Sequence, residues 1–176
     1  MNSMHRRSRV SYVSFLLLLV AAWFSATTAH AQIVALGASN VAGRGVSSSE
    51  AFPAQLERML AAKGYNAHVA NAGINGNTNA DMLARLDQAV PAGTKVVLLG
   101  TLGGRYNARR LGQGDQQAEL ASIMARLRGR GIKIIPVTAA GVGRKHLQPD
   151  GVHLTAEGHA VVAARLLPSV IRALGR

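Results

Sequence analysis

Two short segments of the chain combine residue types that can carry out acyl transfer. Residues 37–43 (GASNVAG) place Ser39 among small residues, and residues 148–155 (QPDGVHLT) place Asp150 three positions before His153. A carboxylate can orient an imidazole, and that imidazole can take a proton from a serine hydroxyl, which is the chemistry of a serine hydrolase. Each segment also has a plain structural explanation, as a helix N-cap or as a turn capped by an aspartate beside a solvated histidine.

A third segment, residues 71–78 (NAGINGNT), offers backbone N–H groups rather than reactive side chains. Glycines at the mouth of a helix can direct N–H groups at the oxyanion that develops during acyl transfer. Tight turns and helix caps need the same residue types, so that explanation stays open as well.

These segments follow predicted strands of an α/β domain. Short apolar runs alternate with stretches whose apolar residues recur at helical spacing, which favours a parallel sheet covered on both faces. We predict a three-layer α/β/α fold, a flavodoxin-like doubly wound parallel sheet of four to five strands, with Pro136 in an edge strand. Ligands bind beyond the carboxyl ends of the strands in such sheets. The predicted strands are 33–36, 68–70, 95–99 and 132–137. The predicted helices are about 50–63 after a Ser49 cap, 78–90 after a Thr78 cap, 113–128, and a last helix after a Thr155 cap.

The three segments together resemble the sequence blocks of SGNH, or GDSL-type, hydrolases. Residues 33–46 (IVALGASNVAGRGV) are similar to the first block, which carries the nucleophilic serine of that family. Residues 71–78 are similar to the second block, and residues 150–159 (DGVHLTAEGH) to the last. The resemblance runs in order along nearly the whole chain that follows the N-terminal segment.

The resemblance implies an exported serine esterase that forms a covalent acyl-enzyme. Ser39 would attack an ester carbonyl, His153 would act as the base, and Asp150 would orient the imidazole. The N–H groups of Ser39 and Gly76 would form the oxyanion hole, and no cofactor or metal is implied. The expected substrates are small acyl esters, of a lipid or an acylated glycan, as for lysophospholipases or thioesterases. A carbohydrate O-deacetylase and a catalytically weak binder of acylated envelope polymers are the alternatives.

The chain departs from the family pattern in two places. The family usually has aspartate before the serine, where this chain has Ala38. Its third block usually reads Gly-x-Asn-Asp, and the asparagine amide is the third oxyanion donor. In residues 102–110 (LGGRYNARR), counting from the glycines puts Arg105 in that place, whereas aligning on the following Ala-Arg-Arg puts Asn107 there. We choose Asn107, because an amide donates a hydrogen bond without changing the charge of the site.

Other kinds of site have weaker support in the sequence. An α/β-hydrolase would carry a Gly-x-Ser-x-Gly elbow, which is missing around Ser39. His146, Asp150 and His153 could bind zinc, but no HExxH or His-x-Glu pattern accompanies them, and the chain has no cysteine. We expect His68 and His159 to be structural or solvated.

The N-terminus has the layout of a secretory signal peptide. His5 and three arginines precede an apolar run at residues 15–24 (FLLLLVAAWF), and Ala29-His30-Ala31 is a small-x-small cleavage sequence. We predict a signal peptide at 1–31 and a single SGNH hydrolase domain at 32–176, in the periplasm or secreted. A membrane anchor is the alternative, although the run is shorter than the roughly 20 residues of a spanning helix. Arg6-Arg7 leaves twin-arginine export open beside the general secretory route.

The predicted mature domain is basic, with 17 Lys and Arg against 8 acidic residues, a net charge of +9. Scattered basic residues and only 4% aromatic content argue against a nucleic-acid partner. Several basic residues fall on predicted loops at the active end, where they either attract an anionic headgroup or acidic glycan or are simply solvated. They are Arg105, Arg109, Arg110, Arg144 and Lys145.

Overall fold

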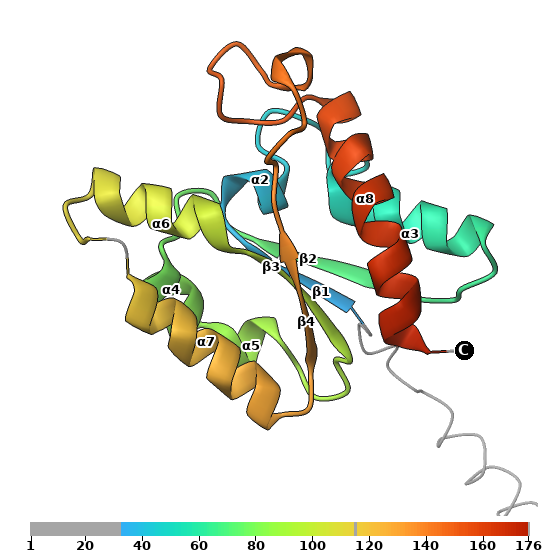
Figure 1. Ribbon diagram of the computed structural model, residues 1–176, viewed down its shortest axis with the longest axis horizontal. Helices are drawn as coiled ribbons and strands as arrows, with labels where there is room; N and C mark the ends of the chain where they lie inside the picture. The colour runs from blue at the N-terminus through green and yellow to red at the C-terminus, as the bar shows by residue number, and fades with distance from the viewer. Residues whose placement is uncertain (1–32, 115, 176) are drawn as a thin grey trace, which may run out of the picture.

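A computed structural model describes residues 33–114 and 116–175 (Figure 1). Four strands form one parallel sheet in the order β2-β1-β3-β4. The predicted signal peptide, with its cleavage position near Ala31, lies outside the described residues. The strands are β1 (Ile33–Gly37), β2 (Val69–Gly73), β3 (Val96–Gly100) and β4 (Lys133–Val137).

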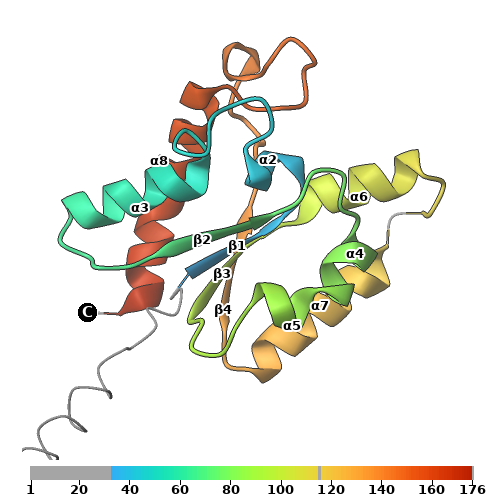
Figure 2. The ribbon, with the colours of Figure 1, turned by 180° about the vertical axis from the view of Figure 1, so that it is seen from behind.

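Helices cover both faces of this sheet, as Figures 1 and 2 show from opposite sides. One face packs against α3 (Phe52–Ala62) and α8 (Ala156–Leu174). The other face packs against α4 (Asn79–Ala84), α5 (Leu86–Ala89) and α7 (Gln117–Gly129). The predicted three-layer α/β/α fold with a doubly wound parallel sheet is therefore confirmed. No helix in the described ranges has the length and apolar content needed to cross a membrane.

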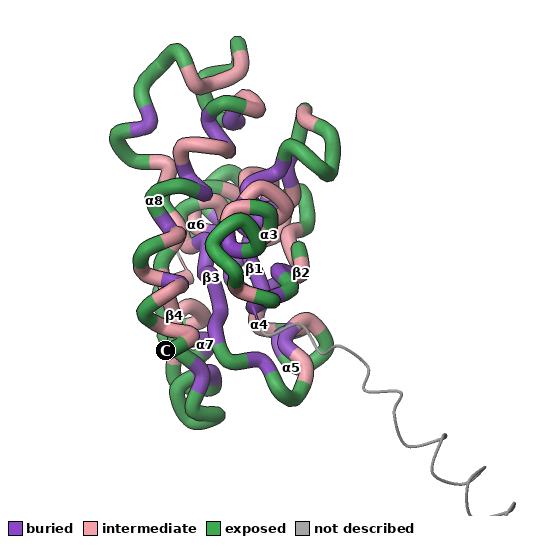
Figure 3. The backbone as a smooth tube through the Cα atoms, turned by 90° about the vertical axis from the view of Figure 1, so that its right-hand side faces the viewer, coloured by how far each residue is buried: buried purple, intermediate pink, exposed green. Residues whose placement is uncertain are grey.

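The position of β1 at the centre of the sheet explains why its sequence is almost continuously apolar. Ile33 and Ala35 face the core beneath α3 and α8, while Val34 and Leu36 face the core beneath α4, α5 and α7. Alternate side chains of a strand point to opposite faces, so a strand covered on both sides must be apolar throughout. All four residues are fully buried, and Figure 3 shows β1 and β3 as the buried centre of the molecule.

Strand β4 lies at one edge of the sheet, as Pro136 predicted. Proline has no N–H to donate to a neighbouring strand, so it fits where only one side of the strand is paired. Lys133 and Pro136 are exposed, in contrast to the fully buried β3 beside them.

Two helix starts differ from the sequence predictions. Ser49 does not cap a helix, because α3 begins at Phe52 with Ala51 at its N-cap and Pro53 in its first turn. The Glu50 carboxylate instead accepts hydrogen bonds from the N–H and hydroxyl of Ser47, closing a turn ahead of the helix. Likewise α7 begins at Gln117 rather than at residue 113.

The helix predicted after Thr78 is interrupted at Arg85, which separates α4 from α5. Thr78 caps α4 as predicted and forms a capping box with Asp81, with Thr78 Oγ1 accepting from the Asp81 N–H at 3.2 Å. Thr155 caps α8 as predicted, accepting from the Gly158 N–H at 3.1 Å.

The prediction that Arg105, Arg109 and Arg110 lie on a loop is wrong. They belong to helix α6 (Thr101–Arg110), which leaves β3 directly. Two adjacent glycines lower the helix propensity of this segment. Here they serve packing, because a Cβ on Gly104 would collide with Asn79 and Met82, and one on Gly103 would press on Ala38. The helix therefore lies close to both α4 and the segment before Ser39.

His159 is buried within α8, in the structural role that the sequence analysis expected. Its Nδ1 accepts a hydrogen bond from the Phe52 N–H at 3.2 Å, and its ring stacks on the Phe52 ring. It thereby serves one of the N–H groups that the first turn of α3 leaves without a helical partner. Burial lowers the pKa of His159 to about 4, although the charge of Glu50 opposes this shift.

This histidine should make the stability of the protein sensitive to mild acid. The unfolded chain binds a proton near pH 6.5 and the folded chain only near pH 4, so the free energy of unfolding falls as the pH drops through this window. We expect this residue to remove about 2 kcal/mol between pH 7.5 and pH 5. Urea unfolding at both pH values should show a smaller loss for His159→Gln than for the wild type. The exposed His68→Gln is the matched control, and an equal pH dependence in all three proteins would contradict the prediction.

Candidate active site

Ser39 stands at the first position of α2 (Ser39–Ala42), a single helical turn directly after β1. Gly43 ends this turn in the left-handed conformation with φ of 82°, and the N–H groups of Gly43 and Arg44 both bond to the Ser39 carbonyl at 3.0 Å. The end of β2 lies against the turn so closely that a Cβ on Gly73 would collide with the Ala42 backbone. The Ser39 backbone is therefore fixed at the carboxyl edge of the sheet.

Asp150 and His153 lie on the loop between η2 (Arg144–His146) and α8. One carboxylate oxygen of Asp150 accepts hydrogen bonds from the N–H groups of Val152 and His153, both at 2.9 Å. This turn brings the His153 ring back over the carboxylate. The hydrogen bond from that ring, together with those two backbone N–H groups, holds the pKa of Asp150 well below its ordinary value. The carboxylate therefore stays ionised at neutral pH.

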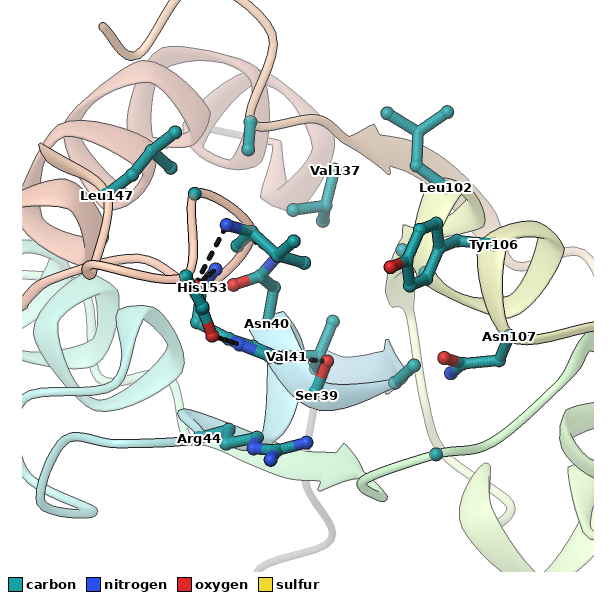
Figure 4. Close-up of a pocket in the computed structure, with 18 of the residues that line it drawn as sticks. Ser39, Asn40, Val41, Arg44, Leu102, Tyr106, Asn107, Val137, Leu147 and His153 are labelled. Atoms are coloured by element: carbon teal, nitrogen blue, oxygen red, sulfur yellow. Dashed lines mark hydrogen bonds and ion pairs between the residues drawn. The ribbon is translucent and has the colours of Figure 1, made fainter. Parts of the chain in front are cut away.

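The three predicted side chains meet in one chain of hydrogen bonds (Figure 4). His153 Nδ1 lies 2.5 Å from Asp150 Oδ2, and His153 Nε2 lies 3.0 Å from Ser39 Oγ. The His153 side chain is only 10% exposed. A carboxylate, a buried imidazole and a serine hydroxyl in this order can transfer the hydroxyl proton to the ring.

Asn40 is a residue of this site that sequence reasoning missed. Its Nδ2 donates to the Val152 carbonyl at 3.0 Å, and its Oδ1 accepts from the Leu154 N–H at 3.1 Å. One amide thus bonds to the backbone on both sides of His153, across 112 and 114 positions of the chain. The only sequence signal is an asparagine next to Ser39, and it does not say which distant loop the amide contacts.

The residues predicted for the oxyanion hole lie around the same cavity. The Ser39 N–H is one of the first N–H groups of α2, which a helix does not use itself. Gly76, with φ of 81°, and Asn107 of α6 both line the cavity, whereas Arg105 is not among its lining residues. Asn107 Nδ2 donates to the Asn77 carbonyl at 2.8 Å, which fixes the amide and leaves its second N–H for a ligand.

A second missed residue, Arg85, supports the loop that carries Gly76. Its guanidinium donates to Asn77 Oδ1 at 2.7 Å and to the carbonyls of Ala72 and Gly37 at 2.8 and 3.3 Å. Burial lowers the pKa of Arg85. Because the ordinary pKa of a guanidinium is very high, Arg85 stays charged. It therefore joins the ends of β1 and β2 to this loop.

The cavity beside Ser39 has a volume of about 680 Å³, in the range of small-molecule sites. Its apolar wall contains Leu102, Tyr106, Val137, Leu147 and Val152. Of the basic residues predicted near the active end, only Arg110 lines it. Arg105, Arg109 and Arg110 are on α6, and Arg144 and Lys145 are on η2, so none is on the irregular loop that was predicted.

The zinc alternative gains no support from the geometry. Within residues 33–114 and 116–175, no cluster of three or more His, Cys, Asp or Glu side chains could hold a metal ion. Asp150 and His153 bond to each other, and His146 lies on η2. His68, which precedes β2 rather than lying within it, pairs with Glu57 at 2.8 Å on the surface.

Comparison with known proteins identifies the family. The model of the GDSL-like lipase/acylhydrolase family matches residues 35–149. The chain belongs to this family. The resemblance found in the sequence is thereby confirmed, and the family's description is that of an ester hydrolase.

Relatives of this GDSL-like chain include an enzyme named as an esterase. The chain is 32% identical over 103 residues to Esterase TesA of Pseudomonas aeruginosa, a match that covers 58% of this chain and 51% of that protein. The match therefore spans about half the length of the relative.

Solved structures support the fold of this GDSL-like chain. The crystal structure of TesA superposes with a TM-score of 0.68 at 21% identity, covering 80% of this chain and 98% of that one. A structure of the psychrotrophic esterase EstA from Pseudoalteromonas, inhibited by monoethylphosphonate, gives a TM-score of 0.59 at 14% identity, covering 82% and 98%.

The bridging amide of Asn40 should stabilise the loop that carries His153. Asn40→Ala removes both hydrogen bonds, so we expect a loss of about 1–2 kcal/mol of unfolding free energy. Hydrogen exchange at the Leu154 amide should also become faster. Asn40→Asp is the comparison variant. It keeps an oxygen that can accept from Leu154, but it replaces the donor to Val152 with a carboxylate oxygen that the Val152 carbonyl repels. Unchanged exchange at Leu154 in the alanine variant would show that the bridge does not hold the loop.

Proposed function

We propose that this chain is a serine ester hydrolase in which Ser39 is the nucleophile, His153 the general base and Asp150 the residue that orients His153. The observation that carries the proposal is the chain of hydrogen bonds from Asp150 through His153 to Ser39, at the wall of a cavity of about 680 Å³. Membership of an acylhydrolase family supports the same reaction.

The reaction proceeds in two halves. His153 Nε2 takes the proton from Ser39 Oγ as that oxygen bonds to the ester carbonyl carbon. The tetrahedral intermediate then collapses, the bond to the alcohol breaks, and His153 gives its proton to the leaving oxygen. Water repeats these steps on the acyl-enzyme, which releases the acid and restores Ser39. Ionised Asp150 stabilises the imidazolium that forms in each half.

The oxyanion is held by the N–H groups of Ser39 and Gly76 and by the Asn107 amide. Support for Asn107 over Arg105 comes from its place in the cavity wall and from the Asn77 carbonyl that fixes its nitrogen. The expected substrates are acyl esters, whose apolar acyl part fits the wall formed by Leu102, Tyr106 and Val137.

We also propose that the protein is exported, on the strength of the basic, apolar and small-residue sequence at positions 1–31. Amino-terminal sequencing of protein recovered from the periplasm and medium tests this. Cleavage after Ala31 is expected, and an intact N-terminus on membrane-bound protein would indicate an anchor instead.

A fluorophosphonate probe tests the nucleophile. The probe should label the protein at Ser39, and purified protein should hydrolyse 4-nitrophenyl butyrate. Ser39→Ala should abolish labelling and reduce kcat by at least about 10⁴-fold, because the covalent route is lost. Ser122→Ala, on the exposed face of α7, is the control and should behave as wild type. Labelling that persists in Ser39→Ala would refute the assignment. A folded protein with neither labelling nor turnover would indicate a binder.

Asn107 is tested by its effect on kcat. Asn107→Ala should lower kcat about 100- to 1,000-fold with a much smaller change in KM, since an oxyanion donor acts mainly in the transition state. Arg105→Gln should leave kcat within a few-fold of wild type. A large loss of kcat in Arg105→Gln with little loss in Asn107→Ala would move the third donor to Arg105. Thermal unfolding of both variants separates these effects from misfolding.

A further inference from the structure

The charges around the candidate site are unevenly distributed. Among the described residues 33–114 and 116–175, Asp150 is the only acidic residue that lines the cavity, and its carboxylate is occupied by His153 and two backbone N–H groups. Two guanidinium groups, those of Arg44 and Arg110, also line the cavity. The charge that remains for a ligand is therefore positive.

Arg44 is held close to Ser39 by its backbone. Its N–H bonds to the Ser39 carbonyl at 3.0 Å, and its own carbonyl accepts from Gln148 Nε2 at 2.8 Å. Gln148 also donates to the Leu154 carbonyl, so the same side chain contacts the loop of His153. The base of the Arg44 side chain is thus fixed relative to both Ser39 and His153.

The Arg44 side chain has no acidic partner in the described part of the chain. It is exposed toward the cavity, unlike Arg126, whose guanidinium pairs with Asp87 at 2.6 Å. Arg110 lies over the Tyr106 ring at 5.9 Å from the ring centroid and so already has a favourable contact. A guanidinium with free donors is suited to bidentate binding of a carboxylate or phosphate.

Arg44 and the apolar wall would contact two different parts of a ligand. Figure 4 shows Arg44 on the opposite side of Ser39 from Val137 and Leu102. An acyl chain against the apolar wall would direct the alcohol part of the ester toward Arg44. A ligand that bridges the two sides is therefore apolar at one end and anionic at the other.

We propose that Arg44 is a specificity-determining residue that binds an anionic group, a carboxylate or a phosphate, in the alcohol part of the ester. This inference rests on the proposed ester hydrolysis and adds the chemistry of the leaving alcohol. It also explains how a strongly basic protein uses one of its charges at the site.

The test compares two esters that differ in charge and little in shape. They are 4-carboxyphenyl butyrate and its neutral analogue 4-carbamoylphenyl butyrate. The measured quantity is the ratio of kcat/KM for the anionic ester to that for the neutral ester. Arg44→Gln should lower this ratio about tenfold, as expected for one charge-assisted hydrogen bond exposed to water, and mainly through KM. Arg44→Lys should give an intermediate ratio, and 0.5 M salt should lower the wild-type ratio.

Arg128→Gln is the matched control, because it removes the same charge from the exposed end of α7, away from the cavity. Its ratio should equal that of wild type. An unchanged ratio in Arg44→Gln would overturn the inference, as would a loss found only in Arg110→Gln. Fluorophosphonate labelling and hydrolysis of the neutral ester by the wild type would leave the proposed function standing in either case. Absence of both would overturn the proposed function as well.

Two further substrates distinguish the sources of the anion. A butyryl ester of glycerol 3-phosphate represents a lipid headgroup, and O-acetylated glucuronate represents an acidic glycan. The substrate whose kcat/KM falls about tenfold in Arg44→Gln identifies whether the anion belongs to a lipid headgroup or to an acidic glycan. If neither depends on Arg44, the proposal is wrong.

Discussion

The hydrogen bond between Ser39 and His153 joins the start of α2 to a loop 114 positions later in the chain, and the surrounding structure fixes both of its ends. The Ser39 end follows the central strand β1 and is held by Gly43 and by the close approach of β2 at Gly73. The His153 end is held by the Asp150 turn. Asn40 then connects the two directly, so the residue after the proposed nucleophile positions the proposed base.

Two charged side chains, those of Asp150 and Arg85, are held by hydrogen bonds in the segments around this bond. Asp150 stays ionised next to the imidazole, where positive charge would develop. Arg85 donates hydrogen bonds to Asn77, which follows Gly76, and to the Ala72 carbonyl. Because both charged groups are held by hydrogen bonds before any ligand binds, little reorganisation would accompany the reaction. The charges of Asp150 and Arg85 are thus already in place in the folded protein before a substrate binds.

Local patterns predicted the layers of the fold, whereas the choice of Ser39, Asp150 and His153 depended on the joint resemblance of three segments to the GDSL-type family. Strand β1 is apolar at every position because both its faces are buried, and Thr78 and Thr155 are visible as caps because their partners lie within a few residues. Helix α6 was missed because its glycines are selected by packing against Ala38 and Met82, which no local pattern records. Asn40 and Arg85 were missed for a related reason. Their hydrogen bonds reach segments whose nearness only the assembled sheet creates.

The edge position of Pro136 also affects how molecules of this protein meet one another. An open strand presents unpaired backbone groups that can recruit a strand from another molecule, which is a route to aggregation. On β4 the proline removes one donor from that edge, and Lys133 places a charge at the start of the strand. In the part of the chain that the structure describes, this edge of the sheet therefore offers an approaching strand fewer backbone donors and an added charge.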